Sequence, residues 1–574
     1  MFDLSQPPRA DAFLCREASF PIIRAMRTAV AQMNPVVGDV KGNVSMALDF
    51  LRRAEASGAE LAVFPELALT GYPPLDLLER DEFVKENLLA LSALAARTRR
   101  AACLIGYADF NPSARGRRLR NGAALLHGGK IAARRFKSLL PTYDIFDESR
   151  YFEPAASNDP VVFRGRRLGV TVCEDIWAGT SLLPRRELYG SSPLAALKKK
   201  GADLYLNLSA SPYYCGKPAE RLPVLAKVAR GLGRPLVYAN QCGANDELIF
   251  DGNSLAFDGA GRVAAAGRAF AEDLLLFDAD RPAPGARSFM PGEAAELRAA
   301  LKLGISDYFR KTGFSRAVLG LSGGIDSALV ACLAADALGP GNVTALLMPS
   351  RFTERRSVDD ALRLARALGL RHETIPIDPV YRALAAALGR RDPYSGIDLT
   401  LQNLQSRARG TILMARANES GALALATGNK SEIAMGYCTL YGDTAGALAP
   451  LADLVKSRVY ELSALYPEIP SSIMTRPPTA ELKPGQKDQD DLPPYDKLDR
   501  LVSLLVEDGL PPAKAAARAG LPAAEASRIA GRIAANEYKR RQLAIGLKVT
   551  RKAFGQGRKM PVAKRLSAGP GPGC

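Results

Sequence analysis

The sequence predicts an α/β protein made of two layered parts joined by a short linker. From Met26 onward, apolar strand-like runs alternate with helical stretches, which is the pattern of an α/β layered domain. A Pro- and Gly-containing segment at 280–285 interrupts the alternation, and a second alternating part follows it. The chain has 574 residues, too many for one core when domains hold about 150 residues.

The N-terminal part is predicted to span residues 26–279. Its strands are expected at 28–32, 61–64, 102–106, 168–172, 204–207 and 235–238, with a helix at 43–57. Residues 1–25 form a predicted flexible extension, because the first core strand starts just after Met26. Charged residues in this extension interrupt any hydrophobic region of a signal peptide.

The C-terminal part is predicted at 293–562, after a linker at 280–292. It opens with a helix at 293–312, then a short buried strand at 316–320 and an apolar helix at 328–338. After about Pro470 the chain becomes Pro- and Asp-rich and then helical. The last residues, 563–574, are rich in Gly and Pro and should be disordered.

The composition is that of a globular protein without a membrane span. Charged residues make up 24% and hydrophobic residues 47%, and no apolar run reaches the roughly 18 residues needed to cross a bilayer. We expect a cytoplasmic protein.

The net charge of +17 is spread along the chain, which favours a solvated basic surface that attracts small anions. Polynucleotide binding is the alternative, but the sequence lacks aromatic residues interleaved with the basic ones and lacks a nucleic-acid recognition motif.

Cysteine and histidine usage excludes several kinds of catalytic site. The eight cysteines form no Cys-x-x-Cys pair, which disfavours a zinc site and a disulfide framework. With two histidines in the whole chain, a Ser-His-Asp or Cys-His mechanism has almost no candidate for its catalytic histidine. Covalent catalysis would therefore need another base.

A loop rich in Ser and Gly at residues 320–327, called the Ser/Gly loop below, predicts a site for pyrophosphate in the C-terminal part. Its glycines allow close approach of the backbone, and the helix that follows points unpaired N–H groups at an anion. The loop is neither a Walker motif nor a Gly-x-Gly-x-x-Gly fingerprint, and a plain Gly-rich turn is the alternative. Its sequence resembles the loop of ATP pyrophosphatases, which implies ATP binding by Gly320, Leu321, Ser322, Gly323, Gly324, Ile325, Asp326 and Ser327.

Three predicted strands of the N-terminal part each end near a reactive residue, namely Glu66, Lys137 and Cys173. An α/β fold gathers such residues at the ends of its strands. A thiol needs a base or a cation to become a good nucleophile, so Glu66 can take its proton while Lys137 stabilises the thiolate and the later oxyanion. For Cys173 alone, a small buried hydrophobe is the alternative.

These residues resemble the Glu-Lys-Cys triad of the nitrilase, or carbon-nitrogen hydrolase, superfamily. The resemblance implies an α-β-β-α sandwich. Stretches 140–148 and 209–217 look like the glutamine-binding segments of glutaminase domains in this superfamily. By that resemblance Tyr143, Ser211 and Lys217 contact glutamine, with ordinary polar loops as the alternative.

The C-terminal part is similar to NAD synthetase along its whole length. The motifs that carry the likeness lie at 348–351, 404–410, 427–432, 436–443 and 476–482, followed by 492–495. Joined to the amidase part, they resemble the glutamine-dependent NAD synthetases. This implies a Rossmann-like ATP pyrophosphatase domain with a parallel sheet, and ATP-dependent amidation of deamido-NAD to NAD with ammonia from glutamine.

The resemblance also assigns residues to the substrates. Asp326 and Glu432 are expected to hold Mg²⁺, because divalent cations are needed where phosphates crowd. Thr427 should contact ATP. The expected contacts of deamido-NAD are Asn403, Glu432, Asp443, Lys456 and Lys539. Lys456 could equally be part of an ordinary helix start, and residues 352–355 depart from the family pattern.

Two alternative functions remain at this point. One is another glutamine-fed ATP pyrophosphatase, such as a GMP or asparagine synthetase, although these use different glutaminase domains and lack the stretches at 476–482 and 493–495. The other is a catalytically dead binding protein, which would require loss of the triad or of the Ser/Gly loop. We also expect a homo-oligomer that binds no nucleic acid and no membrane.

Overall fold

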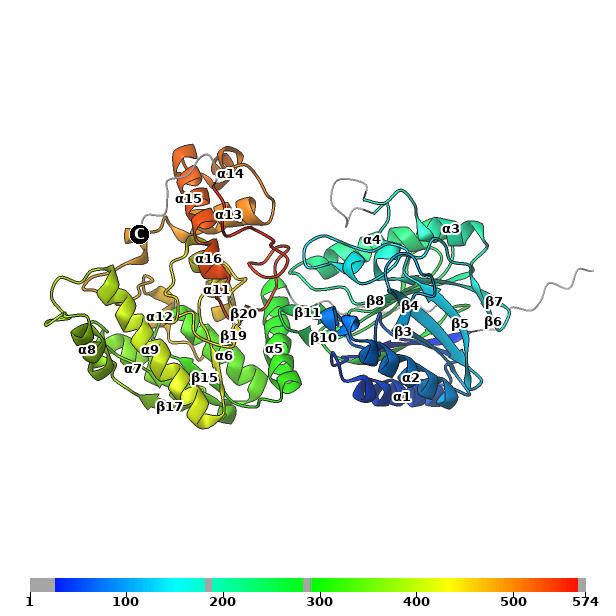
Figure 1. Ribbon diagram of the computed structural model, residues 1–574, viewed down its shortest axis with the longest axis horizontal. Helices are drawn as coiled ribbons and strands as arrows, with labels where there is room; N and C mark the ends of the chain where they lie inside the picture. The colour runs from blue at the N-terminus through cyan, green and yellow to red at the C-terminus, as the bar shows by residue number, and fades with distance from the viewer. Residues whose placement is uncertain (1–25, 181–187, 282–289, 291, 566–574) are drawn as a thin grey trace, which may run out of the picture.

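The computed structural model describes residues 26–180, 188–281, 290 and 292–565 (Figure 1). The predicted extension 1–25 and all but three residues of the predicted tail 563–574 lie outside this range, as does most of the predicted linker 280–292. Figure 1 shows two α/β parts side by side, with the N-terminal part in blue to green and the C-terminal part in green to red.

The N-terminal part is a sandwich of two six-stranded sheets. The first sheet has the order β14-β1-β2-β3-β4-β5, with bounds Asp273–Asp278, Arg27–Gln32, Leu61–Val63, Ala102–Phe110, Leu119–His127 and Lys130–Phe136. The second sheet has the order β13-β12-β9-β8-β7-β6, with bounds Val263–Ala266, Leu255–Phe257, Leu236–Asn240, Leu204–Ser209, Arg166–Val172 and Val161–Phe163.

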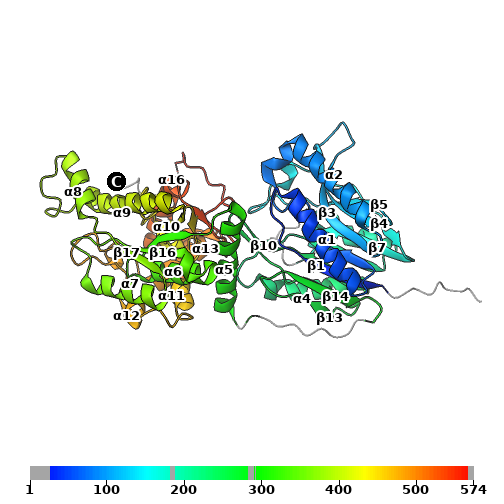
Figure 2. The same cartoon turned by 90° about the horizontal axis from the view of Figure 1, so that it is seen from below.

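Helices cover the two outer faces of this sandwich, as Figure 2 shows. Helices α1 (Val40–Ala56) and α2 (Asp81–Arg97) pack on the first sheet, and α3 (Pro193–Lys199) and α4 (Lys217–Leu232) on the second. Because both faces of each sheet are covered, nearly every residue of strands such as β1 and β8 is buried. This is the physical reason for the continuous apolar runs in the sequence.

The C-terminal part contains one parallel sheet of six strands. Its order is β17-β16-β15-β18-β19-β20, with bounds Arg371–Thr374, Val343–Leu347, Ala317–Gly320, Leu423–Leu425, Leu448–Ala449 and Ile545–Gly546. Strand β15 pairs with β16 on one side and β18 on the other, so the chain changes direction across the sheet at β15. Ligands bind at such switch points in open α/β sheets.

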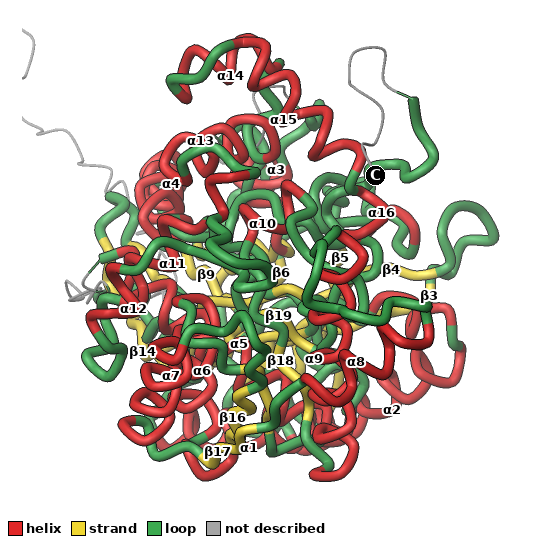
Figure 3. The backbone as a smooth tube through the Cα atoms, turned by 90° about the vertical axis from the view of Figure 1, so that its left-hand side faces the viewer, coloured by secondary structure: helices red, strands yellow, loops and turns green. Residues whose placement is uncertain are grey.

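Helices flank this sheet on both faces, with α6 and α7 on one side and α9 on the other (Figure 3). From α6 to α12 the helices have the bounds α6 (Ile325–Leu338), α7 (Arg355–Ala367), α8 (Asp378–Ala387), α9 (Leu399–Ser420), α10 (Lys430–Met435), α11 (Lys456–Ser463) and α12 (Ser471–Thr475). A helical cap follows with α13 (Tyr495–Val506), α14 (Pro512–Ala519), α15 (Ala523–Ala535) and α16 (Glu537–Arg540). None of the helices that the structure describes is long and apolar enough to cross a membrane.

The predicted elements agree with the structure apart from some of their ends. Helix α1 begins three residues before its predicted start, because the Asp39 side chain accepts a hydrogen bond from the backbone of Gly42 and caps the helix. Helix α6 begins at Ile325 rather than at Ala328, so the end of the Ser/Gly loop forms its first turn. The α/β fold class and the parallel C-terminal sheet are confirmed.

The two parts meet along α5 (Glu293–Thr312), which stands between them in Figures 1 and 2. The hairpin of β10 (Cys242–Asn245) and β11 (Leu248–Asp251) extends from the N-terminal part and packs on α5. Ala244 and Ile249 of this hairpin belong to the same hydrophobic core as Leu301 of α5. The core is therefore continuous across the junction.

Candidate active sites

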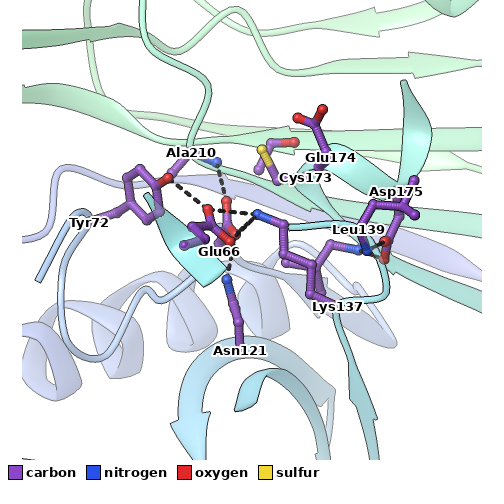
Figure 4. Close-up of polar contacts among 12 residues, drawn as sticks. Glu66, Tyr72, Asn121, Lys137, Leu139, Cys173, Glu174, Asp175 and Ala210 are labelled. Carbon is purple, nitrogen blue, oxygen red and sulfur yellow. Dashed lines mark hydrogen bonds and ion pairs between the residues drawn. The ribbon is translucent and has the colours of Figure 1, made fainter. Parts of the chain in front are cut away.

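The first candidate site lies between the two sheets of the N-terminal part, where Glu66 and Lys137 meet. Glu66 follows β2 and Lys137 follows β5, and both side chains are fully buried. The Lys137 Nζ donates to Glu66 Oε1 at 2.8 Å (Figure 4). The structure thus brings together two residues that the sequence predicted to act together.

A second carboxylate, Glu148, contacts the same lysine. Lys137 Nζ lies 2.8 Å from Glu148, whose Oε1 also accepts a hydrogen bond from the Tyr72 hydroxyl at 2.8 Å. Burial alone would lower the pKa of Lys137, but Glu148 and Glu66 outweigh it and raise the pKa well above its ordinary value. The lysine therefore stays an ammonium. Sequence reasoning did not assign Glu148, although a carboxylate inside the stretch 140–148 was a signal for it.

Cys173 stands directly after β7, at the first residue of the 3₁₀ turn η3 (Cys173–Ile176). Its φ of 40° places a non-glycine residue in the left-handed region, which is a strained conformation often found at functional sites. Asp175 holds this turn, because its carboxylate accepts hydrogen bonds from the backbone of Val172 and of Leu139. The same aspartate thereby fixes the turn of Cys173 against the segment that follows Lys137.

The charges around Cys173 favour a neutral thiol in the resting site. Burial and the Glu66 carboxylate raise the pKa of the thiol well above its usual range, and Lys137 only partly opposes them. Attack by sulfur therefore needs a base that takes the proton. Glu66 is held for that role by Asn121 Nδ2 at 2.7 Å and by the backbone N–H of Ala210 at 3.3 Å.

Tyr143, the first predicted glutamine contact, donates its hydroxyl to both carboxylate oxygens of Glu174 at 3.0 Å. The Tyr189 hydroxyl donates to the same carboxylate at 2.9 Å. Glu174 follows Cys173 directly, is 2% exposed, and has its pKa raised by burial. It forms no ion pair within the part of the chain that the structure describes. Sequence reasoning did not single out this carboxylate, because an acidic residue beside a nucleophile has no distinctive spacing.

Ser211 and Lys217, the other two predicted glutamine contacts, lie within and at the end of the loop that follows Ala210, whose backbone N–H donates to Glu66. Ser211 is buried and donates its backbone N–H to Asn240 Oδ1 at 3.0 Å. Lys217 begins α4, and its Nζ donates to the carbonyl of Pro212. Burial, followed by the nearby charge of Arg221, lowers the pKa of Lys217 to about 7. An anionic ligand would restore the charge of this lysine.

The second candidate site is a cavity of about 1100 Å³ in the C-terminal part. All the residues predicted to bind ATP, deamido-NAD or Mg²⁺ line this one cavity, although they come from positions far apart in the sequence. These are the loop 320–327 together with Asn403, Thr427, Glu432, Asp443, Lys456 and Lys539.

The Ser/Gly loop follows β15 and leads into α6, at the switch point of the sheet. Gly323 has a φ of +84°, and a Cβ there would lie 2.3 Å from the carbonyl oxygen of Ser357, so only glycine fits. The hydroxyls of Ser322 and Ser327 lie 3.0 Å apart, and Ser327 donates to the carbonyl of Gly324. These bonds hold the loop in shape at the N-terminus of α6.

The two predicted metal ligands converge in the cavity. Lys456 Nζ contacts Asp326 Oδ2 at 2.5 Å and Glu432 Oε1 at 3.3 Å, and Asn429 Nδ2 donates to Asp326 Oδ1 at 2.9 Å. Burial alone would lower the pKa of Lys456, but Asp326 and then Glu432 raise it above its ordinary value. Two carboxylates that already hold a cation between them form an oxygen-donor set that fits Mg²⁺ when substrate phosphates complete the shell.

Lys456 is the first residue of α11 and also contacts both carboxylates, so its place at a helix start does not keep its side chain out of the cavity. The other predicted dinucleotide residues lie nearby. Asn403 Oδ1 accepts from the Thr439 hydroxyl at 2.7 Å, and Asp443 Oδ1 accepts from the backbone of Thr439 at 2.6 Å. Lys539 Nζ donates to the carbonyl of Gly436 at 2.8 Å.

The loop that departs from the family pattern is held by local bonds, since the Thr353 hydroxyl accepts from the backbone of Ser350. Arg476, at the start of the stretch 476–482, donates to the Ser357 hydroxyl and pairs with Asp360 at 2.7 Å. Arg409 is a residue that sequence reasoning left unassigned. Arg409 lines the cavity, its Nε donates to the carbonyl of Met348 at 3.0 Å, and burial lowers its pKa to about 10.

Comparisons with known proteins match both parts of the chain. The family described as NAD synthase matches residues 297–543, and the family described as carbon-nitrogen hydrolase matches residues 27–286. The glutamine-dependent NAD(+) synthetase of Synechocystis sp. is 44% identical over 549 residues, covering 93% of this chain and 98% of the relative. That of Thermotoga maritima is 39% identical over 593 residues, covering 95% of this chain and 99% of the relative.

Solved structures agree with this likeness. The glutamine-dependent NAD⁺ synthetase from Acinetobacter baumannii, in complex with ADP, superposes with a TM-score of 0.73 and 35% identity, covering 94% of this chain and 98% of that one. The enzyme of the same description from Cytophaga hutchinsonii gives a TM-score of 0.79 at 22% identity with the same coverage, which supports the fold.

Proposed function

The chain belongs to the glutamine-dependent NAD(+) synthetases and is a glutamine-hydrolysing carbon–nitrogen ligase, and we propose how its two sites divide the reaction. The site around Cys173 releases ammonia from glutamine. The cavity around the 320–327 loop uses ATP and that ammonia to convert deamido-NAD to NAD, with AMP and pyrophosphate as the other products. The observation that carries the proposal is the Glu66–Lys137 pair beside Cys173, in the same chain as a separate cavity at the N-terminus of α6.

In the first half-reaction, Glu66 takes the thiol proton while the sulfur of Cys173 attacks the side-chain amide carbon of glutamine. Lys137 stabilises the tetrahedral oxyanion with its ammonium. Collapse of this intermediate breaks the C–N bond, and Glu66 returns its proton to the leaving nitrogen, so that ammonia departs and a thioester remains. Water, activated by Glu66, then hydrolyses the thioester to glutamate and restores the thiol.

Recognition of glutamine is assigned to the groups around Glu174. A buried carboxylate held by two tyrosine hydroxyls beside the nucleophile is a suitable partner for the α-ammonium of glutamine. Lys217, whose pKa is lowered by burial and by Arg221, would pair with the α-carboxylate and regain its charge. Tyr143 and Ser211 would line the path between these two charges.

In the second half-reaction, the nicotinate carboxylate of deamido-NAD attacks the α-phosphate of ATP and displaces pyrophosphate. The backbone amides of the loop and the N-terminus of α6 receive the leaving phosphates. Ammonia then attacks the activated carboxyl carbon of the adenylate and AMP leaves. Thr427 lines the ATP side of the cavity, and Asn403, Asp443 and Lys539 line the side assigned to the dinucleotide.

Asp326 and Glu432 are proposed to hold Mg²⁺, which would neutralise the phosphates of ATP during adenylation. Lys456 contacts both carboxylates and would move toward the phosphates when ATP binds. A homo-oligomeric state and a cytoplasmic location are part of the same proposal. Sedimentation of the purified chain and microscopy of a tagged chain test these two points.

The overall proposal is tested by incubating the protein with ATP, Mg²⁺, glutamine and deamido-NAD and leaving out one component at a time. NAD should form only when all four are present, except that ammonium should replace glutamine. NAD formation without ATP, or without any nitrogen source, would contradict it.

A further inference from the structure

Lys311, near the end of α5, reaches from the C-terminal part into the N-terminal part. Its Nζ donates to the carbonyl oxygen of Pro35 at 2.9 Å, to that of Ala244 at 2.8 Å and to Asn245 Oδ1 at 2.9 Å. These three acceptors use all three N–H bonds of the ammonium. The side chain is only 9% exposed, so the bonds are shielded from water.

From Asn245 the hydrogen bonds continue to the glutaminase site. Asn245 Nδ2 donates to the carbonyl of Tyr72 at 2.7 Å, and the Tyr72 hydroxyl donates to Glu148 Oε1 at 2.8 Å. Glu148 contacts Lys137. Figure 4 shows Tyr72 beside Glu66, the other carboxylate on this lysine. We call Lys311, Asn245, Tyr72 and Glu148 the junction relay.

Every member of the junction relay is buried or nearly so. Asn245 and Tyr72 are 8% and 3% exposed, and Glu148 is 6% exposed. Buried hydrogen bonds of this kind are strong and specify one arrangement of the groups that they join. The Asp307 carboxylate, 3.5 Å from Lys311 Nζ, also accepts from the backbone of Ala244 and from Asn34 Nδ2. The end of α5 is therefore docked by more than one contact.

We propose that Lys311 is a positioning residue for the glutaminase reaction, which it controls from the C-terminal part by holding Tyr72 and Glu148, and through them the Lys137 ammonium, in place. This inference rests on the proposed roles of Cys173, Glu66 and Lys137. It assigns a function to a residue outside both sites. The glutaminase site would be complete only while α5 is docked on the N-terminal part.

The proposal predicts which kinetic parameter changes. Lys137 stabilises the oxyanion, so a small displacement of its ammonium should lower kcat for glutamine hydrolysis, whereas the groups assigned to glutamine binding are held by other contacts. Misplacement of a catalytic group by about 1 Å can cost about 10²-fold in rate. We expect Lys311→Met to lower this kcat by about tenfold or more, with a much smaller change in the KM for glutamine. NAD formation from ammonium should stay near the wild-type rate.

The matched control is Lys302→Met, the same substitution at an exposed lysine of the same helix. It should behave as the wild type in both assays. Asn245→Asp provides a second variant that separates the relay from docking. An aspartate there still accepts from Lys311 but cannot donate to the carbonyl of Tyr72, so kcat should fall although the junction stays closed. This variant also serves if Lys311→Met does not fold.

Tyr72→Phe removes only the hydroxyl that donates to Glu148, and combining it with Lys311→Met tests the path. If both residues act through the same relay, the double variant should lose little more kcat than the worse single variant. Losses that multiply, a wild-type kcat in Asn245→Asp, or equal losses with glutamine and with ammonium would overturn the proposal. Cys173→Ala is run in parallel, because glutamine hydrolysis by that variant would contradict the assigned triad rather than the relay.

Discussion

At the level of single residues, the glutaminase site depends on one lysine that pairs with two buried carboxylates. Removing a partner from a buried charged cluster leaves uncompensated charge, which is far more costly than losing an exposed ion pair. Lys137 is therefore important both for the charge balance of Glu66 and Glu148 and for the oxyanion.

Lys137→Ala should lose glutamine-driven NAD formation and keep ammonium-driven formation. Removing one oxyanion donor typically costs about 10²–10³-fold in rate, and the two carboxylates left behind would also oppose a thiolate. The measurement is glutamate release from glutamine. A variant with a near-normal rate would show that Lys137 has no role in the chemistry.

Glu174→Gln should raise the KM for glutamine more than it lowers kcat, because the amide cannot pair with the α-ammonium. A charge-assisted hydrogen bond contributes about 1.5–3 kcal/mol, which corresponds to roughly ten- to 150-fold in KM. Glu86→Gln, at an exposed position of α2, is the control. Discrimination against glutaramic acid, which has no α-ammonium, should shrink in the variant, and an unchanged KM with unchanged discrimination would rule out this role.

Asp326→Ala and Glu432→Ala should lose activity with glutamine and with ammonium alike, since adenylation precedes any use of nitrogen. The decisive measurement is pyrophosphate release from ATP and deamido-NAD without a nitrogen source. Asp359→Ala, on the exposed face of α7, should release it normally. Wild-type release by either carboxylate variant would make that residue structural and remove it from the metal site.

At the level of elements, the sequence predicted the strands and helices whose burial is regular. Strands β1, β2 and β8 are apolar runs because both faces are covered, and α5 carries strong helix signals along its length. The hairpin β10–β11 was not predicted, because its strands are four residues each and it packs on α5, an element far along the chain. Such short strands depend on a partner that the local sequence does not reveal.

The Ser/Gly loop provides a prediction at this level. Gly323→Ala places a Cβ at a positive φ, which costs about 1–2 kcal/mol, and against the Ser357 carbonyl. The loop would have to move, so the KM for ATP should rise and stability against denaturant should fall, while glutamine hydrolysis through Cys173 chemistry persists. Gly341→Ala, where a Cβ meets nothing within 4 Å, is the control. An unchanged KM for ATP in Gly323→Ala would show that the loop tolerates the change.

At the level of the whole molecule, the sequence predicted both sites but not how the two parts touch. Glu66, Lys137 and Cys173 could be grouped because each ends a strand, and the cavity residues because of their motifs. The roles of Glu148 and Glu174 and the contacts of Lys311 could not be predicted from the sequence. They depend on side chains that meet only after the sheets and α5 are packed. Ammonia is mostly ammonium at neutral pH, so an enclosed route between the sites would favour its use.

The central claim is that one chain carries a glutaminase site and a separate NAD-forming site. Its most direct test is the rate of NAD formation by Cys173→Ala, measured with glutamine and with ammonium chloride at saturating ATP, Mg²⁺ and deamido-NAD. We expect no NAD from glutamine above background and near-wild-type formation from ammonium. Equal loss with both nitrogen donors in a folded variant, or continued formation from glutamine, would contradict it.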